Sequence, residues 1–336
     1  MADSPTVTRR GRGRAGGHGA LAVLAASLLA LGLSACSDEA EPVPQVLPTL
    51  APEVLQYDAT LEPSAAVLPL VPTSATSLSV TDFEQLRLIL GFAILDSSSP
   101  EPEQARYRAA LANSPALSPG LLAAGDARLR ADFGFGAADV AWQAEYDGPD
   151  GAGWVIVFTD DVPMDSVRRA VRAGVAPLAG AVVDAERHYV TSATPPAAEE
   201  SWGAEPDLVA LVGSEASSTY VARGCLEFDA VFGAGMQADL ASDPEAALEE
   251  LDPLDGFAVA LGGELVTVQL GEDRPDAFDR ARLADLMPRT RPEFGTVFAR
   301  SVADPGTGRL GYDLARPADA ARLVTAGTLP FAVCAD

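Results

Sequence analysis

The chain has 336 residues, a length typical of about two domains. All 23 basic residues are arginine, and 48 acidic residues leave a net charge of −25. This charge excludes a nucleic-acid binder, because neutralising phosphates requires a basic face. Two His and three Cys are too few for a His-rich metal site or a zinc ribbon, so we expect no metal and no cofactor. The hydrophobic content of 48% is sufficient for a folded core.

Residues 1–35 are typical of a secretory signal. Several arginines precede an uncharged apolar run from Ala20 to Leu33, which is shorter than the about 20 residues that a membrane-spanning helix needs. The run ends in Leu33-Ser34-Ala35-Cys36 and resembles the lipobox of bacterial lipoproteins. The resemblance implies cleavage before Cys36 and a diacylglycerol thioether on its sulfur. The alternative is an ordinary secreted protein in which Cys36 is incidental.

The composition of the rest of the chain agrees with this resemblance. The chain has no lysine, whereas Ala, Gly, Arg and Asp are abundant, as in proteins of GC-rich genomes. With the lipobox, the chain is therefore similar to actinobacterial envelope lipoproteins. We expect it on the extracytoplasmic face of the cell membrane, held by its lipid, because its negative charge repels anionic headgroups.

Two segments are expected before the main fold. Residues 36–77 are rich in proline and lack glycine, which favours an extended tether. Within it, residues 54–70 carry apolar side chains, and the alternative is that they lie along the folded domain. Residues 78–137 are predicted to be a small helical region, with a capping box at Thr81 and Glu84 and further helices over 101–112 and 119–132.

The remaining sequence predicts two similar α+β units, residues 138–235 and 255–336, joined by a linker helix within 236–254. In the first unit, apolar and polar residues alternate as in strands before and after a turn at 147–151. A helix is expected over 165–173, and the alternation returns over 182–192. We then expect a strand over 208–212, a helix over 215–222 and a strand over 226–232. The same order returns in the second unit, which predicts a β-β-α-β-β-α-β repeat.

Short matches support a tandem duplication with mixed or antiparallel sheets and helices on one face. At an offset of 111, Val155, Val157, Asp165, Arg169 and Ala170 match Val266, Val268, Asp276, Arg280 and Ala281. At an offset of 103, Leu211, Val221, Gly224, Leu226 and Phe228 match Leu314, Val324, Gly327, Leu329 and Phe331. Gly224 and Gly327 are expected to be left-handed residues that end a helix. The alternative is two unrelated α+β halves.

Cys225 and Cys334 are the cysteines that remain once Cys36 is lipidated. An oxidising compartment favours a disulfide between them, each lying in the last strand of its unit. In the chain-entropy model, closing so long a loop stabilises the fold by roughly 4–5 kcal/mol. The alternative is two free thiols.

The other chemical candidates have simpler structural interpretations. His188 is the single histidine after the signal, and we expect it in a strand without a catalytic role. Gly306-Thr307-Gly308-Arg309-Leu310-Gly311 matches a dinucleotide motif, but a strand and not a helix follows, so it is expected to be a hairpin loop. The paired acids Asp160-Asp161 and Glu272-Asp273 precede helices, where they stabilise the helix dipole or weakly bind a cation.

The sequence thus favours a non-catalytic lipoprotein that binds or scaffolds an envelope partner or ligand, with no nucleic-acid partner. One alternative is an extracytoplasmic hydrolase that uses carboxylates. The other is the solute-binding lipoprotein of a transporter, although such proteins are built from parallel βαβ repeats.

Overall fold

A computed structural model describes residues 54–240, 248–287 and 293–334. The expected signal, the lipidation of Cys36 and the first part of the tether lie outside these residues. Residues 241–247 of the expected linker helix over 236–254 lie outside them too, and the described residues on either side form short helical turns at Met236–Leu240 and Leu248–Glu250. In the described part of the chain, no helix is both long and apolar enough to cross a membrane.

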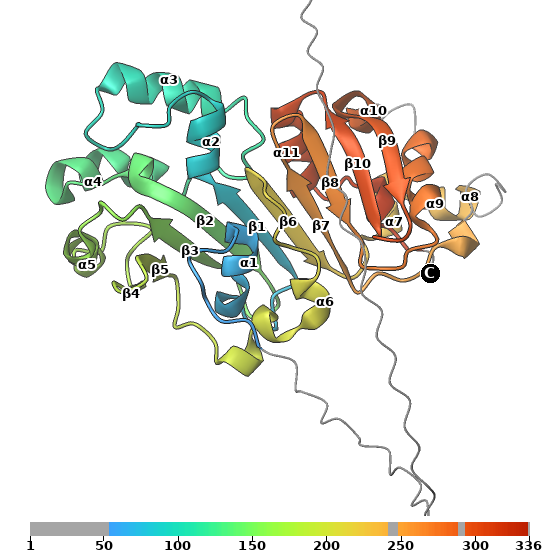
Figure 1. Cartoon of the computed structure of the whole chain (residues 1–336), viewed down its shortest axis with the longest axis horizontal. Coiled ribbons are helices and arrows are strands. Elements are labelled where there is room, and N and C mark those ends of the chain that lie inside the picture. Colours follow the sequence, from blue (N-terminus) through green and yellow to red (C-terminus); the bar gives the residue numbers. More distant parts are fainter. Residues whose placement is uncertain (1–53, 241–247, 288–292, 335–336) are drawn as a thin grey trace, which may run out of the picture. The chain divides into compact units, whose positions relative to one another are not determined.

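The fold is α+β, built on one antiparallel sheet of ten strands (Figure 1). The strand order is β4-β5-β3-β2-β1-β6-β7-β8-β10-β9. The strands are β1 (Ser77–Asp82), β2 (Val140–Asp147), β3 (Gly153–Phe158), β4 (Val182–Asp184), β5 (Tyr189–Thr191), β6 (Ser218–Arg223), β7 (Gly256–Leu261), β8 (Leu265–Gln269), β9 (Phe298–Asp304) and β10 (Arg309–Leu314). The two sheets expected from the sequence are therefore one continuous sheet.

Helices lie between the strands along the chain. They are α1 (Pro63–Ala66), α2 (Phe83–Ile89), α3 (Glu101–Leu111), α4 (Asp126–Phe133), α5 (Met164–Arg172), α6 (Pro206–Val209), α7 (Phe228–Phe232), α8 (Met236–Leu240), α9 (Ala277–Arg282), α10 (Glu293–Val297) and α11 (Pro317–Thr325). Short 3-10 turns supplement them, among them η1 (Leu68–Leu70), η5 (Trp202–Ala204) and η8 (Pro330–Ala332).

The strand order is the same in both halves when it is followed outward from the centre. β1 pairs with β6 in the middle of the sheet. Outward from β1 come β2, β3, β5 and β4, and outward from β6 come β7, β8, β10 and β9. Each half thus contains two hairpins joined by a helical connection, preceded by one central strand.

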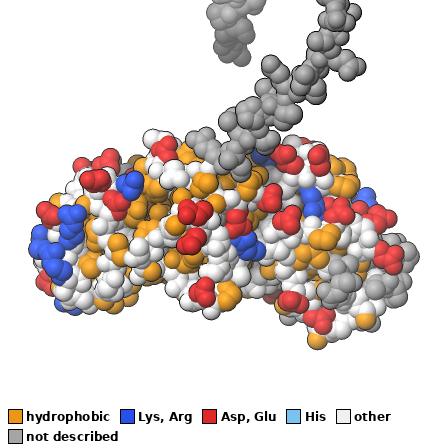
Figure 2. Space-filling view, turned by 90° about the horizontal axis from the view of Figure 1, so that it is seen from below, with side chains coloured by type: hydrophobic (Ala, Val, Ile, Leu, Met, Phe, Trp, Pro, Cys, Tyr) orange, Lys and Arg blue, Asp and Glu red, His pale blue; other side chains and the backbone are white. Residues whose placement is uncertain are grey.

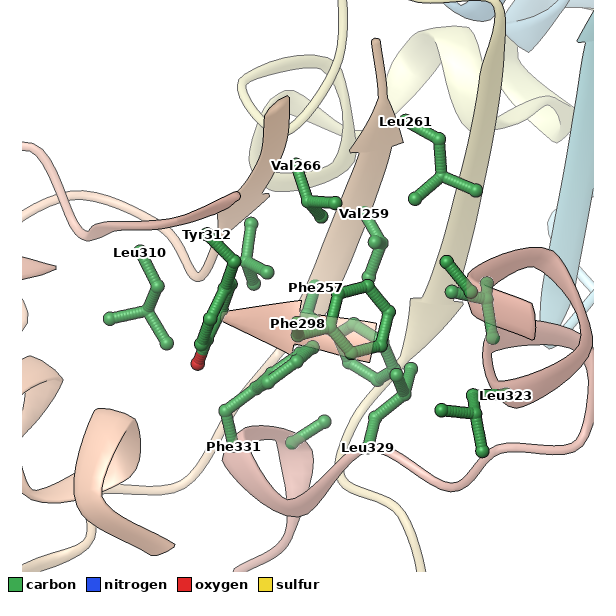
Figure 3. Packing of buried hydrophobic residues seen from close by; sticks show 14 of the residues in the cluster. Phe257, Val259, Leu261, Val266, Phe298, Leu310, Tyr312, Leu323, Leu329 and Phe331 are labelled. Atoms are coloured by element: carbon green, nitrogen blue, oxygen red, sulfur yellow. The ribbon is translucent and has the colours of Figure 1, made fainter. Parts of the chain in front are cut away.

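One face of this sheet carries helices in both halves. Cross-strand partners share a face, and the register links Ile156 of β3 through Gln143, Thr81 and Ser218 to Leu261 of β7. On this face Ile156 packs with residues of α2–α5, and Leu261 packs with residues of α9–α11. Figure 3 shows the second of these cores, where Phe257, Tyr312 and Phe331 lie together.

The folded body begins earlier than expected, because residues 54–77 are not a tether. Val67, Leu68 and Val71 are fully buried against the second face of the sheet. Backbone hydrogen bonds hold this segment, including Trp202 N to Val71 O at 2.9 Å. Pro63 and Pro69 stand at the start of short helical turns, where a missing N–H costs nothing. The proline content that favoured an extended chain instead reflects α1 and η1.

Three elements of the first unit were predicted with the wrong type. The expected strand over 208–212 is the end of α6, the expected helix over 215–222 is largely β6, and the expected strand over 226–232 contains α7. In the second unit the expected last strand is η8, which leaves one bridge between Leu226 and Val333. These apolar runs are short, and periodicity does not separate a short strand from a helical turn.

The region expected to be helical, 78–137, contains α2, α3 and α4 as predicted, but its first residues belong to β1 in the middle of the sheet, which the sequence did not predict. Asp82 and not Thr81 caps α2, accepting a hydrogen bond from Gln85 N at 2.9 Å. The helix expected over 119–132 begins only at Asp126, because 119–122 form a turn around Gly120, whose φ is 100°. The hairpin of β2 and β3, helix α5 and helix α3 agree with the sequence.

Cys225 and Cys334 lie at disulfide distance, with Cα atoms 5.7 Å apart. Neither is in a strand: Cys225 follows β6, and Cys334 follows η8. Gly224 and Gly327 are both left-handed, with φ of 63° and 64°. Gly327 follows α11 as expected, whereas Gly224 follows a strand.

Candidate functional site

A cavity of about 280 Å³ lies between α2, α3, α4 and β2. Its lining is mostly apolar and comes from elements far apart in sequence. The apolar lining residues include Phe83, Leu95, Tyr107, Leu111, Leu122, Ala123, Ala124, Ala127, Ala137, Ala138 and Val140. Concave, largely apolar sites with a few placed polar groups are the usual form of a small-molecule site.

The floor of the cavity is fixed by hydrogen bonds around residues 136–140. Arg87 of α2 is buried, and its Nη1 donates to the carbonyl oxygens of Ala138 and Val140 at 3.0 and 2.9 Å. The Asp139 carboxylate accepts from Gly136 N and from Ser97 N, each at 2.8 Å. Buried backbone groups in this stretch are thereby paired, which makes the floor rigid.

Gly136 permits this close packing. A Cβ atom built there would lie 2.4 Å from Oδ1 of Asp126 and 2.8 Å from Cγ of Arg130. The same Asp126 oxygen accepts a hydrogen bond from Ala137 N at 2.7 Å. The site therefore needs glycine for α4 to approach the floor.

Tyr107 of α3 is one of the buried polar residues that line the cavity. The side chain is 6% exposed, and its hydroxyl is buried next to the Arg87 guanidinium, a group that does not itself line the cavity. Burial raises the pKa of Tyr107 to about 12, against the opposing charge of the nearby Arg87 guanidinium. The hydroxyl thus stays protonated at neutral pH.

Ion pairs surround the solvent-exposed side of the cavity. Glu101, at the start of α3, binds Arg108 of the same helix and Arg130 of α4. Arg130 also contacts Asp126, with Nε and Oδ2 3.0 Å apart. Hydrogen bonds from Arg108 and Arg130 hold the pKa of Glu101 below its usual range. These carboxylates are engaged as ion-pair partners.

A second hollow adjoins the cavity and is itself about 310 Å³. The two share Arg108, Leu111, Pro119 and Ala123 as lining residues. The second hollow extends to Ala318, at the start of α11. An elongated molecule that outgrew the cavity could therefore continue along apolar surface.

The residues singled out from the sequence lie away from this cavity. His188 is in the turn between β4 and β5 with φ of 54°, and not in a strand as expected. Gly306–Gly311 forms the expected hairpin loop between β9 and β10. Asp160, Asp161, Glu272 and Asp273 are exposed before α5 and α9.

Asp276, another acid before α9, does not have the simple helix-capping role that was expected for the acids preceding α5 and α9. Although it stands at the N-cap of α9, its carboxylate makes no side-chain capping bond and is paired with Arg274 and Arg280. Among the residues that the structure describes, no three His, Cys, Asp or Glu side chains are grouped to hold a metal ion.

Sequence reasoning missed the cavity itself. The one available signal in the sequence was Arg87. It is a charged residue on a helix face that is otherwise apolar, between Leu86 and Leu90. The other components come from separate segments whose convergence depends on tertiary packing.

Comparisons with known proteins give little further information. No family model matches the chain, and no curated protein matches it. Two solved structures, crystal forms I and III of TP0453, align with a TM-score of 0.30 and 8% sequence identity. The alignments cover 81% and 80% of this chain and 100% of the other. Similarity at this level defines neither a family nor a function.

Proposed function

We propose that the chain is a non-catalytic, lipid-anchored binding protein on the extracytoplasmic face of the cell membrane. We place its binding site in the cavity between α2, α3, α4 and β2. The observation that carries this proposal is a largely apolar cavity of about 280 Å³ whose floor is fixed by the hydrogen bonds of Arg87 and Asp139.

The residue types in the lining support binding and not catalysis. The lining contains no Ser, Thr, Cys or His, so it offers none of the usual paired nucleophile and base. Its acids, Glu101 and Asp126, are held by Arg130. A hydrolase with two carboxylates would need them free to exchange protons with a substrate.

Lipid anchoring rests on the lipobox Leu33-Ser34-Ala35-Cys36 and on the signal that precedes it. With residues 54–77 in the folded body, the tether shortens to 37–53. Extended at about 3.1 Å per residue, such a tether reaches on the order of 50 Å. The body would then stay close to the membrane surface.

We also propose that the two halves of the sheet arose by internal duplication. The matching outward orders of β1–β5 and β6–β10 support this. The repeat would run from β1 to β5 and from β6 to β10, and it would not begin at β2 as the sequence offsets implied. The offset of 111 pairs β3 with β8, which fits this repeat, whereas the offset of 103 pairs β6 with α11, which does not.

A fluorescent apolar probe tests the binding proposal. The chain from Ser37 onward, exported behind an ordinary cleavable signal so that its cysteines oxidise, would be titrated with N-phenyl-1-naphthylamine. Ala127→Phe adds a bulky ring at a position of α4 that lines the cavity, and Ala131→Phe places the same side chain on that helix outside the lining; both alanines are exposed. We expect saturable binding that Ala127→Phe abolishes and Ala131→Phe retains. Equal binding by both variants would contradict the proposed site.

A further inference from the structure

We propose that the ligand of this cavity is a single-chain amphiphile, bound through its unbranched alkyl chain along the cavity and the adjoining hollow while its head group stays in solvent. This inference rests on the proposed binding function and adds the chemical class of the ligand. It follows from the pairing of the polar groups in the lining, the balance of its charges and the extent of its apolar space.

The two amide side chains of the lining are already engaged by the protein. Gln104 is 3% exposed, and its Nε2 donates to two backbone carbonyl oxygens at 3.2 and 2.9 Å. Gln143 is 1% exposed, and its Oε1 accepts from Leu121 N at 2.8 Å. Its Nε2 donates to Ser118 Oγ at 2.8 Å and to Glu145 Oε1 at 2.9 Å. A polar head group would have to break one of these bonds, which leaves a buried partner unpaired.

The charged side chains of the lining balance one another. They are two acids, Glu101 and Asp126, and two arginines, Arg108 and Arg130. Glu101 pairs with both arginines, and Arg130 also pairs with Asp126. Asp126 further accepts a hydrogen bond from Ala137 N at 2.7 Å. The lining thus has no net charge and no unpaired carboxylate, so it favours neither an anionic nor a cationic head group.

The remaining lining is mainly aliphatic. Leu95, Leu111 and Leu122 are buried, and Val140 joins them from β2. An alkyl chain placed among these side chains gains dispersion contacts and loses its contact with water. Each methylene buried in this way should tighten binding about fourfold, the change that corresponds to its transfer out of water. Affinity should therefore depend on chain length and not on the head group.

The apolar space is long enough for an extended chain. An apolar cavity of about 150 Å³ holds benzene, so about 280 Å³ corresponds to roughly eleven non-hydrogen atoms, a chain of about ten carbons. The adjoining hollow of about 310 Å³ shares Leu111 and Ala123 with the cavity and continues to Ala318. Two apolar spaces joined at one side suit a linear chain better than a compact molecule. A longer chain would extend from the cavity into the second hollow.

The charge of the rest of the surface sets the conditions of the test. Acidic side chains are spread over the face seen in Figure 2, and the net charge of the chain is −25. Such a surface repels any anion from a distance, whatever the binding site recognises. At about 0.15 M salt this repulsion is screened beyond about 8 Å, so that a difference between head groups reports on the site itself.

The first test varies the head group at constant chain length. Decanoate, decylammonium and decylphosphocholine, each below its micelle concentration, would displace N-phenyl-1-naphthylamine from the chain from Ser37 onward. At about pH 7 and about 0.15 M salt, the first two carry opposite charges. We expect dissociation constants within about fivefold of one another, because the head groups stay in solvent and distant charges are screened. A larger spread would overturn the assignment, since the site would then recognise the head group.

The second test varies the chain at constant head group. From hexylphosphocholine to decylphosphocholine the dissociation constant should fall about fourfold per methylene, and tetradecylphosphocholine should bind more tightly again. Ala112→Phe adds a ring at a position that lines the second hollow only, and should remove the tetradecyl gain while leaving decyl binding unchanged. Ala109→Phe, at an exposed position of α3 outside both linings, should keep the gain. Affinity that does not rise with chain length, or a tetradecyl gain that survives Ala112→Phe, would overturn the assignment.

The outcomes separate the two proposals. If N-phenyl-1-naphthylamine binds and Ala127→Phe blocks it, but the alkyl amphiphiles do not displace it, the binding site stands and the alkyl-chain assignment falls. If neither the amphiphiles nor the naphthylamine bind, both proposals fail.

Discussion

Arg280 and Asp276 form an ion pair shielded from solvent, with Nε and Oδ2 2.7 Å apart and both side chains fully buried. The same guanidinium donates to the carbonyl oxygens of Phe331 and Val333 at 2.8 and 2.7 Å. It thus ties α9 to the segment that leads to Cys334. The interior of the second half contains a charged cluster that fixes the end of the chain next to its disulfide.

Removing the carboxylate of this pair should be strongly destabilising. Asp276→Asn leaves Arg280 buried without its counter-charge, and we expect a loss of about 3–5 kcal/mol in the free energy of unfolding at neutral pH. Asp279→Asn, which removes a pair with the exposed Arg282, should cost less than about 1 kcal/mol. Urea unfolding of both variants measures the difference, and equal losses would refute the buried-pair argument.

The pH dependence of this effect has a definite sign. Burial raises the pKa of Asp276, but Arg274 and Arg280 outweigh it and hold the pKa below its ordinary value. A lowered pKa in the folded state stabilises the fold above the unfolded pKa, and this stabilisation is lost as the pH falls. The difference between wild type and Asp276→Asn should therefore shrink below about pH 4.

Asp82 should behave in the opposite way. Burial raises its pKa to about 6 in the folded state, so the folded chain binds the proton more tightly than the unfolded chain does. Stability contributed by this group is present at low pH and is lost as the pH rises from about 4 towards 6. Asp82→Asn can still accept from Gln85 N and should stabilise the protein at pH 7 by about 1–3 kcal/mol. Thermal unfolding at about pH 3.5, where the gain should vanish, is the control.

Two glycines of one hairpin loop provide a matched pair. A Cβ atom on Gly308, whose φ is 61°, would lie 1.6 Å from the carbonyl oxygen of Gly271. At Gly306 the nearest atom would be 3.6 Å away. Gly308→Ala should destabilise by about 2 kcal/mol or more, and Gly306→Ala by less than about 1 kcal/mol. Similar melting temperatures for the two variants would contradict the loop geometry.

The anchoring proposal predicts a specific labelling pattern. In cells given an alkyne fatty acid, the wild-type chain should become labelled and Cys36→Ala should not. A chain with both Cys225→Ser and Cys334→Ser should remain labelled, because these residues are distant in sequence from the lipobox. Label retained in Cys36→Ala would exclude Cys36 as the lipidation site.

Local patterns in the sequence predicted those elements whose pattern is long or sharply bounded. The hairpin of β2 and β3 has clear alternation around a turn at 147–151, and α3 has Pro100 before it. The segments around α6 and α7 failed because their apolar runs are too short to distinguish periods. The cavity could not be predicted, because Arg87, Tyr107 and Val140 meet only through the packing of α2 and α3 on the sheet.

The most direct test of the central claim is a crystal structure of the chain from Ser37 onward grown with 8-bromooctanoate. The anomalous signal of bromine marks where the aliphatic chain of the bound probe lies. We expect one strong bromine peak within the cavity, among Leu95, Leu111 and Leu122. An empty cavity, or bromine bound elsewhere on the molecule, would contradict the account.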